Sequence, residues 1–537
     1  MAGPVEVPLQ VLDADFARQL ALALTAAAAG PADALPEVLP QPAALSLLRR
    51  CTRVLKGEPT LLRIAPPPGP HAEVVVIGDL HGQLHDLLTI IQKAGAPSEQ
   101  RMLVFNGDLV DRGAWGLELL LLLCAWKLAA PRSVFLLRGN HESTYCSWVY
   151  GFRREVLAKY GDGAQGEAVF AACQVLFSHL PLAAVVAGST LVVHGGLARR
   201  PPRRATRRSL PDEVAIASLA DIAASSKGGE DPDPAKPEQR LAADLLWSDP
   251  GSEAGVQLGA RPGDVGIRFG PDVTEAFLRD NGLRCILRGH EGPDSRVQRP
   301  DMQPMSGGWT LDHNTPAGKL YTVFSAPCYP QFRDSFTNLG AVAVLGPPGF
   351  NAPRFVQYEA APRPQATPYY LETEDAGVDE GAEVDEDAEL EAAGTAGAAG
   401  AAGEAGPAGA TGTAGATAEG PGGSSQEGSS SEESDSQGGM GSEGSDREAA
   451  GGNEAPPAAG QEQVQADAQQ APIAEASRLA AAAVAAAAAA AGEHVPGDSV
   501  LAEQSEEGQP EEGQQPALKR LKLEPLAISV EVGAVDD

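Results

Sequence analysis

Five short apolar runs in this chain each end in a cluster of glycine with histidine, aspartate or asparagine. The runs are rich in β-branched and aliphatic residues, and helical patterns at 85–94 and 115–129 separate the first three, which predicts β-α-β units and a sheet with parallel portions. In such sheets, ligands bind outside the carboxyl ends of the strands. The sequence therefore predicts an α/β fold with one crevice where the five clusters meet. The runs and their clusters are 74–77 with GDLHG, 102–105 with NGDLVDRG, 134–137 with RGNHE, 191–193 with HGG, and 285–287 with RGHE.

The side chains in these clusters are carboxylates, an amide and imidazoles, without a thiol. One such residue after a strand would be interpreted as a turn or a cap, but five clusters are hard to explain as turns alone. Oxygen and nitrogen ligands suit Mn, Fe or Zn, and glycine lets the backbone approach an ion or a phosphate closely. The candidate residues are Asp79, His81, Asp108, Asp111, Asn140, His141, His194 and His290.

Charge is spread unevenly along the chain, whose formal net charge is −32. Residues 371–537 hold 35 acidic and 5 basic residues, whereas residues 1–370 hold 37 acidic and 35 basic ones. The last third, rich in Ala, Gly and Ser, is predicted to be a disordered acidic tail with one helix over 471–491. Residues 1–370 are nearly neutral, which argues against a protein that binds nucleic acid through its overall positive charge. The longest strongly apolar run, 117–126, is too short to span a bilayer, so we expect no membrane partner.

Three motifs, GDLHGQ, GDLVDRG and RGNHE, resemble in this order the metal-dependent phosphoprotein phosphatases that act on serine and threonine. HGGL, LLWSDP, FGPDVTEAFL, RGHE and FSAPCY agree with that family in order and spacing. The resemblance covers about residues 73–370, with a weaker extension to about residue 40, and RGAWGLE and PRPQATPYY are most similar to the plant type-7 serine/threonine phosphatases. It implies a calcineurin-like metallophosphoesterase fold, a mixed α/β architecture with two packed mixed β-sheets flanked by helices.

The resemblance also implies a two-metal site with Mn, or Fe with Zn. Asp79 and His81 would bind the first ion, Asp108 would bridge both, and Asn140, His194 and His290 would bind the second. A water activated by both ions would attack phosphorus directly. His141 would act as general acid, oriented and kept protonated by Asp111. Arg112 would contact the phosphate oxygens, and Tyr329 would stand at the edge of the site.

Two positions depart from the family pattern. Gly263 stands where the family usually has a second phosphate-contacting arginine, and the nearest candidate is Arg261. Cys328 replaces the asparagine that usually precedes the site tyrosine. We expect a protein serine/threonine phosphatase, and two alternatives stay open: a weak or inactive phosphatase fold that serves as a scaffold, and a metallophosphoesterase that acts on small phosphate esters.

The sequence predicts a variable N-terminal segment at 1–40, a catalytic domain at 41–370 with an Arg/Pro-rich insertion at 199–240, and the tail at 371–537. The arginine-rich run Arg199–Arg208 has two interpretations. It forms a solvated surface loop, or it binds acidic substrates, a calmodulin-type regulatory partner or a nuclear import receptor. We expect phosphorylated proteins as substrates, no specific nucleic acid, and a monomer. Lys519-Arg520-Leu521-Lys522 matches a short import signal and favours the nucleus over the cytoplasm.

Overall fold

The structure is a computed structural model of the 537-residue chain. It describes residues 5, 7–8, 12–201, 214–258, 265–332 and 336–370. The predicted tail at 371–537, with its predicted helix and import signal, lies outside the described residues, and so do Arg261 and Gly263.

One of two mixed sheets has five strands in the order β14-β13-β2-β3-β4. Strands β2, β3 and β4 are parallel to one another, and β13 and β14 add antiparallel pairs at one side. Their bounds are β2 Glu73–Ile77, β3 Arg101–Phe105, β4 Val134–Leu136, β13 Gly340–Leu345 and β14 Arg354–Tyr358.

The second mixed sheet has six strands in the order β1-β5-β6-β10-β12-β11. Strands β6, β10 and β12 are parallel neighbours, while the β5–β6 and β11–β12 pairs are antiparallel. Their bounds are β1 Leu61–Ile64, β5 Ala183–Val186, β6 Thr190–Val193, β10 Cys285–Arg288, β11 Trp309–Thr315 and β12 Gly318–Val323.

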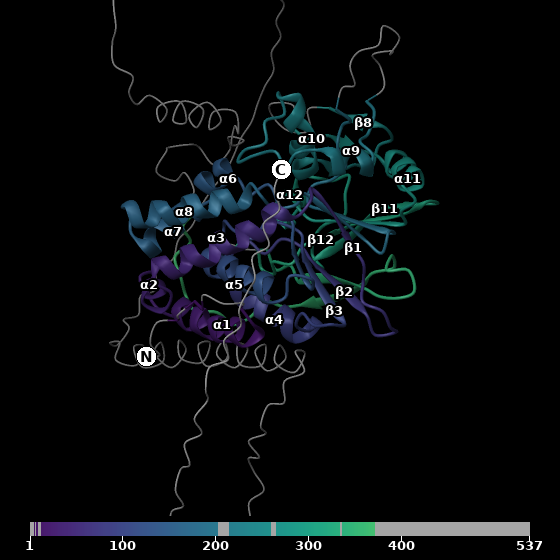
Figure 1. Cartoon of the computed structure of the whole chain (residues 1–537). Coiled ribbons are helices and arrows are strands. Elements are labelled where there is room, and N and C mark those ends of the chain that lie inside the picture. Colours follow the sequence, from purple (N-terminus) through teal and green to yellow (C-terminus); the bar gives the residue numbers. More distant parts are fainter. Residues whose placement is uncertain are drawn as a thin grey trace, which may run out of the picture. The chain divides into compact units, whose positions relative to one another are not determined.

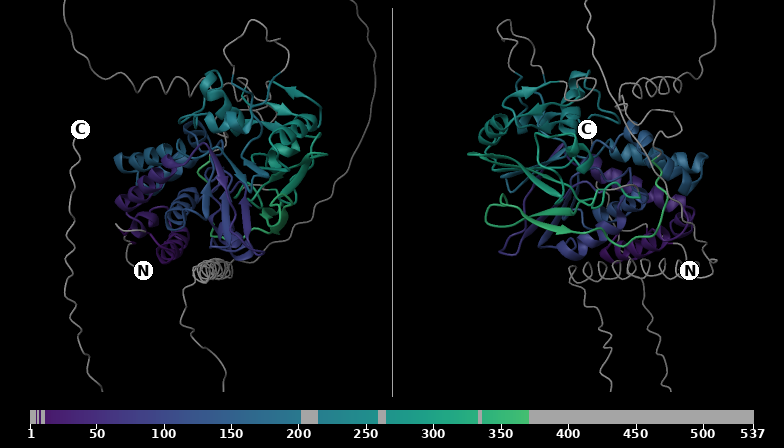
Figure 2. Two further views of the ribbon diagram at one scale, coloured as in Figure 1. Left: turned by 45° about the vertical axis from the view of Figure 1, so that its right-hand side comes forward. Right: turned by 180° about the vertical axis from the view of Figure 1, so that it is seen from behind.

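The two sheets pack face to face, and helices cover their outer faces (Figure 1). One core cluster joins inward-facing residues of both sheets, such as Val76 of β2 and Leu287 of β10. A second cluster joins the outer face of the five-stranded sheet to helices α1, α3, α4, α5 and α8, and a third joins the outer face of the six-stranded sheet to α9, α10 and α11. In Figure 2 the strands lie between the two groups of helices. The predicted two-sheet fold flanked by helices is confirmed.

The helices on the five-stranded side surround α5. Residues 116–127 of α5 are all buried, because its apolar residues go round the whole helix and pack against the sheet as well as α1 and α3. The apolar run at 117–126 is thus a central core helix. In the described part of the chain, no helix is long and apolar enough to cross a membrane. The bounds are α1 Ala14–Ala28, α2 Ala34–Val38, α3 Gln41–Gly57, α4 Leu84–Ala94, α5 Gly116–Ala129, α6 Thr144–Val149, α7 Phe152–Tyr160 and α8 Ala164–Phe177.

Helices α9 and α10 lie in the predicted insertion or begin there. Leu219 and Ile222 of α9 are buried in the core on the six-stranded side, so this part of the insertion packs as an integral layer. Arg199 and Arg200, which open the arginine run, pair with Asp244 and Asp221. Residues 202–213 lie outside the described residues. The remaining elements are α9 Leu219–Ala224, α10 Pro237–Trp247, α11 Pro271–Asp280, α12 Pro293–Val297, β7 Asp249–Pro250, β8 Val256–Gln257 and β9 Arg268–Phe269, of which the last three form a small sheet.

The first forty residues contribute to the main core. Asp13 caps α1 by accepting a hydrogen bond from the backbone N–H of Phe16, as expected for an aspartate at a helix start. Leu20 and Leu24 of this helix are fully buried, which stabilises the fold by about 1.5–3 kcal/mol for each side chain. The division of the chain at residue 40 stays a prediction.

Candidate metal centre and phosphate site

The predicted site residues follow strands of both sheets. Because β2, β3 and β4 are parallel neighbours, and β6 and β10 are too, each sheet delivers its residues at the edge where these strands end. A parallel bridge between Asp79 and Phe324, directly after β12, joins the two edges. The five-stranded sheet supplies Asp79, His81, Asp108, Asp111, Arg112, Asn140 and His141, and the six-stranded sheet supplies His194 and His290.

The carboxylate of Asp108 is shared by two groups of potential metal ligands. One group is His81, Asp108 and His141, and the other is Asp108, His194 and His290. Oxygen Oδ2 of Asp108 lies 3.6 Å from Nε2 of His81, while Oδ1 lies 3.3 Å from Nε2 of His194. One carboxylate therefore faces two sites at once.

Asn140 joins the second group. Its Oδ1 lies 2.8 Å from Nε2 of His194 and 2.9 Å from Nδ1 of His290. Burial lowers the pKa of His194, but the charge and hydrogen bond of Asp108 outweigh that effect and raise this pKa to about 9. A cation at this point would replace the proton on His194, since metal ligation requires the neutral imidazole.

Backbone carbonyls orient two of the imidazoles. Nδ1 of His81 lies 3.1 Å from the carbonyl oxygen of Val110, and Nδ1 of His194 lies 2.8 Å from that of Asn106. An Nδ1–H that donates to a carbonyl leaves the Nε2 lone pair free to bind a cation. The resulting set of imidazole nitrogens with carboxylate and amide oxygens fits divalent transition metals.

Asp79 lies beside these groups but belongs to neither. Both of its carboxylate oxygens accept from the backbone N–H of His290, at 3.1 and 3.0 Å. A side chain at Gly289 would collide with this carboxylate, so the close approach requires glycine. Burial, followed by the charge of Asp108, raises the pKa of Asp79 to about 7. Its role as a metal ligand stays a prediction.

His141 and Asp111 form the expected pair. Nδ1 of His141 lies 2.8 Å from Oδ2 of Asp111, which leaves Nε2 facing Asp108 at 4.0 Å. Burial lowers the pKa of His141 to about 4 and raises that of Asp111. The contact orients the imidazole of His141 as predicted. Burial, however, disfavours the protonated His141 that Asp111 was expected to maintain.

Arg112 and Tyr329 lie at the same place. The ring of Tyr329 is buried, with its centroid 5.0 Å from that of His81, and lies beside the candidate metal ligands. The guanidinium of Arg112 lies against Tyr150 and Tyr370, and its Nε has no hydrogen-bond partner among the described residues. A buried N–H donor without a partner beside a candidate metal centre suits an anionic ligand.

Backbone strain concentrates at this site. Of nine described non-glycine residues with positive φ, six lie in the site or directly beside it. Each left-handed conformation costs about 1–3 kcal/mol, so surrounding contacts must hold these residues in place, as is common at active sites. The six are His81 at 43°, Asp108 at 49°, Asp111 at 69°, Arg112 at 67°, His290 at 70° and Cys328 at 47°.

Two supporting residues belong to the sequence motifs but follow from no local pattern. Glu142, the last residue of RGNHE, accepts from the backbone N–H groups of Asp108, Leu109 and Gly139. Arg288, the first residue of RGHE, is fully buried and donates to the carbonyl oxygen of Gly195 and to the carboxylates of Asp249 and Glu291. The two side chains brace the loops of the five-stranded and six-stranded sheets, respectively.

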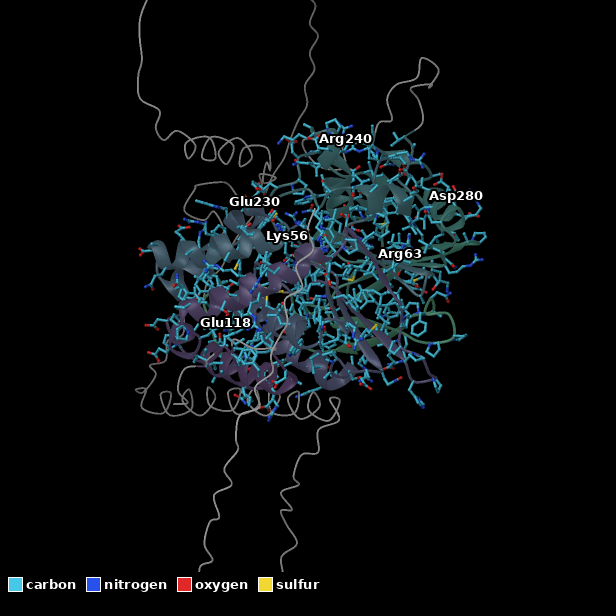
Figure 3. All side chains as sticks on the ribbon, viewed as in Figure 1. Lys56, Arg63, Glu118, Glu230, Arg240 and Asp280 are labelled. Carbon is cyan, nitrogen blue, oxygen red and sulfur yellow. The ribbon has the colours of Figure 1, made fainter. Side chains whose placement is uncertain are left out.

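Arg138 has a similar bracing role. It is fully buried and donates to the backbone carbonyls of Lys227, Gly229 and Glu230. Figure 3 labels Glu230. The described part of the insertion is therefore tied to the loop that carries Asn140 and His141.

Comparisons with known proteins agree with this geometry. The calcineurin-like phosphoesterase family matches residues 72–294. The chain is 42% identical to serine/threonine-protein phosphatase 7 of Arabidopsis thaliana over 356 residues, which cover 63% of this chain and 85% of that protein. This chain belongs to the serine/threonine-protein phosphatase family.

Other members of the family are matched over different shares of their length. Serine/threonine-protein phosphatase 5 of Arabidopsis thaliana is 37% identical over 60% of this chain and 52% of its own length. The match to the long form homologue of phosphatase 7 from the same plant, at 42% identity, spans only 26% of that protein. Among solved structures, a protein serine/threonine phosphatase from Saccharomyces cerevisiae is 31% identical, with a TM-score of 0.50 over 62% of this chain and 95% of that one.

Proposed function

We propose that this protein hydrolyses phosphoserine and phosphothreonine in proteins, with water as the nucleophile and His141 as the general acid. The shared carboxylate of Asp108 carries the proposal, because its two oxygens face His81 on one side and His194 on the other. A carboxylate placed between two ligand groups is what a two-metal phosphatase site requires.

The ligands would hold two cations, Mn or Fe with Zn. His81 and Asp79 would bind one ion, while Asn140, His194 and His290 would bind the other, with Asp108 between them. When bound, the two ions supply positive charge for the phosphate and lower the pKa of a water that attacks phosphorus. The protein contributes fixed imidazole orientations, because backbone carbonyls hold Nδ1 of His81 and of His194.

His141 would donate a proton from Nε2 to the departing serine or threonine oxygen. Its contact with Asp111 through Nδ1 supports this role, since the contact directs Nε2 toward the site. The ion pair of Asp111 with protonated His141 and the neutral pair of protonated Asp111 with His141 contain the same number of protons. Nε2 carries a proton in both forms, so the burial that lowers the pKa of His141 leaves the acid functional.

Arg112 would bind the phosphate oxygens, and Tyr329 would stand at the edge of the same site. The unpartnered Nε of Arg112 supports this assignment. Whether Arg261 replaces the second arginine that the family usually has stays a prediction, because its position is not described.

One assay separates the proposal from its two alternatives. The purified protein is given p-nitrophenyl phosphate or a phosphothreonine peptide, with and without Mn²⁺. We expect Mn²⁺-dependent hydrolysis of both, with the higher kcat/KM on the peptide. Hydrolysis of the small ester alone would favour a phosphoesterase for small molecules, and metal binding without turnover would favour a scaffold.

Two further proposals concern segments around the catalytic domain. A calmodulin-type or other regulatory partner would bind the arginine run at 199–208, and its deletion should then abolish that binding. Lys519-Arg520-Leu521-Lys522 would direct the protein to the nucleus. Replacing Lys519 and Arg520 with alanine in a fluorescent fusion should move it to the cytoplasm, and an unchanged distribution would reject the signal.

A further inference from the structure

The guanidinium of Arg112 lies in a corner between two tyrosine rings. Its Cζ is 4.2 Å from the ring centroid of Tyr150 and 4.5 Å from that of Tyr370, and the two rings lie 5.8 Å apart. These distances place the rings on adjacent sides of the guanidinium, in contact with each other. The ring of Tyr150 also lies 4.9 Å from the imidazole of His141, so the corner touches the catalytic acid as well.

Tyr370, which contributes one of these rings, is the last residue of the predicted catalytic domain. The chain at 369–370 crosses Gly151, where a Cβ atom would lie 2.7 Å from the backbone nitrogen of Tyr370. The carbonyl oxygen of Tyr369 accepts from Arg154, and the Tyr369 ring lies 5.7 Å from Nζ of Lys159. Lys159 is itself held by the buried carboxylates of Glu118 and Glu155. These contacts fix the segment, so Tyr370 is positioned by the fold.

Arg112 is held in a way that leaves its Nε–H without a hydrogen-bond partner among the described residues. Against the effect of burial, the charge of the Asp294 carboxylate helps to raise the pKa of Arg112, but the two described side chains make no ion pair, and the Arg112 backbone has a strained φ of 67°. An aromatic ring attracts the guanidinium through its π-face and uses none of the N–H groups that a phosphate would bind. A carboxylate partner would instead compete with the phosphate for those donors.

We propose that Tyr370 is a positioning residue that holds Arg112, together with Tyr150, in the orientation that binds phosphate. The proposal rests on the phosphate-binding role given to Arg112 above. Loss of the ring frees one side of the guanidinium, so Tyr370→Ala should weaken phosphate binding and lower kcat/KM by about three- to thirtyfold, the range of a partly buried cation–π contact. Tyr370→Phe retains the ring and should behave like the wild type.

The test compares full-length wild type, Tyr370→Ala and Tyr370→Phe. The matched control is Trp148→Ala, which removes a half-exposed ring 4.0 Å from the guanidinium of Arg153. Calorimetric titration of the Mn²⁺-loaded proteins with inorganic phosphate gives the Kd. Phenylglyoxal labelling of the metal-free proteins, mapped by mass spectrometry, reports how accessible Arg112 is. Thermal melts establish that each variant is folded.

The expected result is a higher Kd and KM and faster labelling of Arg112 in Tyr370→Ala alone. An unchanged Kd and labelling rate would overturn the proposal, and so would tighter phosphate binding, which would mean that Tyr370 obstructs the site. If the wild type binds phosphate but does not hydrolyse phosphopeptides, the proposed function fails while this test still decides the role of Tyr370. If the wild type is active and Tyr370→Ala equals it, only the positioning role fails.

Discussion

The two sheets supply different parts of the site and hold them by different means. The five-stranded sheet brings the shared Asp108 and the acid His141, and its loops are braced by Glu142, which accepts from three backbone N–H groups. The six-stranded sheet brings His194 and His290, and its loops are braced by Arg288 in a buried network with Asp249 and Glu291.

This difference predicts different consequences of substitution on the two sides. On the five-stranded side, Glu142 ties the loop after β3 to the loop after β4, and Asp108, Asp111 and Arg112 there have strained backbones. Substitutions on this side should therefore affect the reacting groups directly. On the six-stranded side, buried charges neutralise one another, so removing one leaves the others uncompensated and should first affect folding. Four substitutions test this comparison.

Asp108→Asn should have the largest effect, because Asp108 faces both ligand groups. An amide offers less negative charge to two cations, so we expect both ions to bind weakly and turnover to fall to background. Metal content by plasma mass spectrometry and phosphopeptide turnover are the measurements. Asp162→Asn, at an exposed position, is the control. Retention of both ions with normal turnover would remove Asp108 from its shared role.

His141→Ala should leave metal content intact and lower phosphopeptide turnover by about 10²–10⁴-fold, the usual contribution of a general acid. The loss should be smaller with p-nitrophenyl phosphate, whose leaving group departs without a donated proton. His71→Ala, at an exposed histidine, serves as control. Equal losses on both substrates would contradict the acid role and assign His141 to binding instead.

Arg288→Met should mainly reduce stability. It removes a partner of the buried carboxylates of Asp249 and Glu291, and breaking a buried ion pair on one side costs about 3–5 kcal/mol. The free energy of unfolding is measured by urea denaturation. Arg284→Met, four residues earlier and exposed, should have little effect. A stable Arg288→Met protein with low activity would reverse the distinction between the two sheets.

Glu142→Gln should have the smallest effect of the four. The amide keeps one acceptor oxygen but loses the negative charge that holds three backbone N–H donors. We therefore expect metal affinity or turnover to fall by about 10–100-fold, as is usual when a residue that orients metal ligands is replaced. Calorimetric Mn²⁺ titration is the measurement. The loss should affect both ions, whereas Glu291→Gln should affect only the ion at His194 and His290. The same pattern in both variants would argue against separate bracing.

Much of the fold was accessible from the sequence because the strands and their clusters have strong local patterns. The predicted runs at 74–77 and 102–105 lie in β2 and β3, and the helix pattern at 85–94 lies in α4. The run at 285–287 lies in β10. Alternating apolar runs and glycine-rich turns are local properties, so they can be recognised without knowing which strands are neighbours.

Other features depend on distant pairings that no local pattern encodes. The bracing of Asp108 by Glu142 joins residues thirty-four positions apart, and the contact of Tyr370 with Arg112 joins the C-terminal end of the catalytic domain to the loop after β3. The Ala/Pro-rich composition of residues 1–40 predicts a separate variable segment, because it gives no sign that α1 is buried against α5. Burial is a property of the packed molecule, and composition alone does not reveal it.

The sequence by itself determined the family, the order of the strands along the chain and the kinds of side chain that follow them, because these are written in contiguous motifs. Only the tertiary structure decided that Asp108 presents one oxygen to each ligand group, that Asp79 turns toward the backbone of His290, and that Arg112 rests against two tyrosines. Those facts follow from the face-to-face packing of the two sheets, which places their strand ends side by side and brings residues from distant parts of the chain to within a few ångströms.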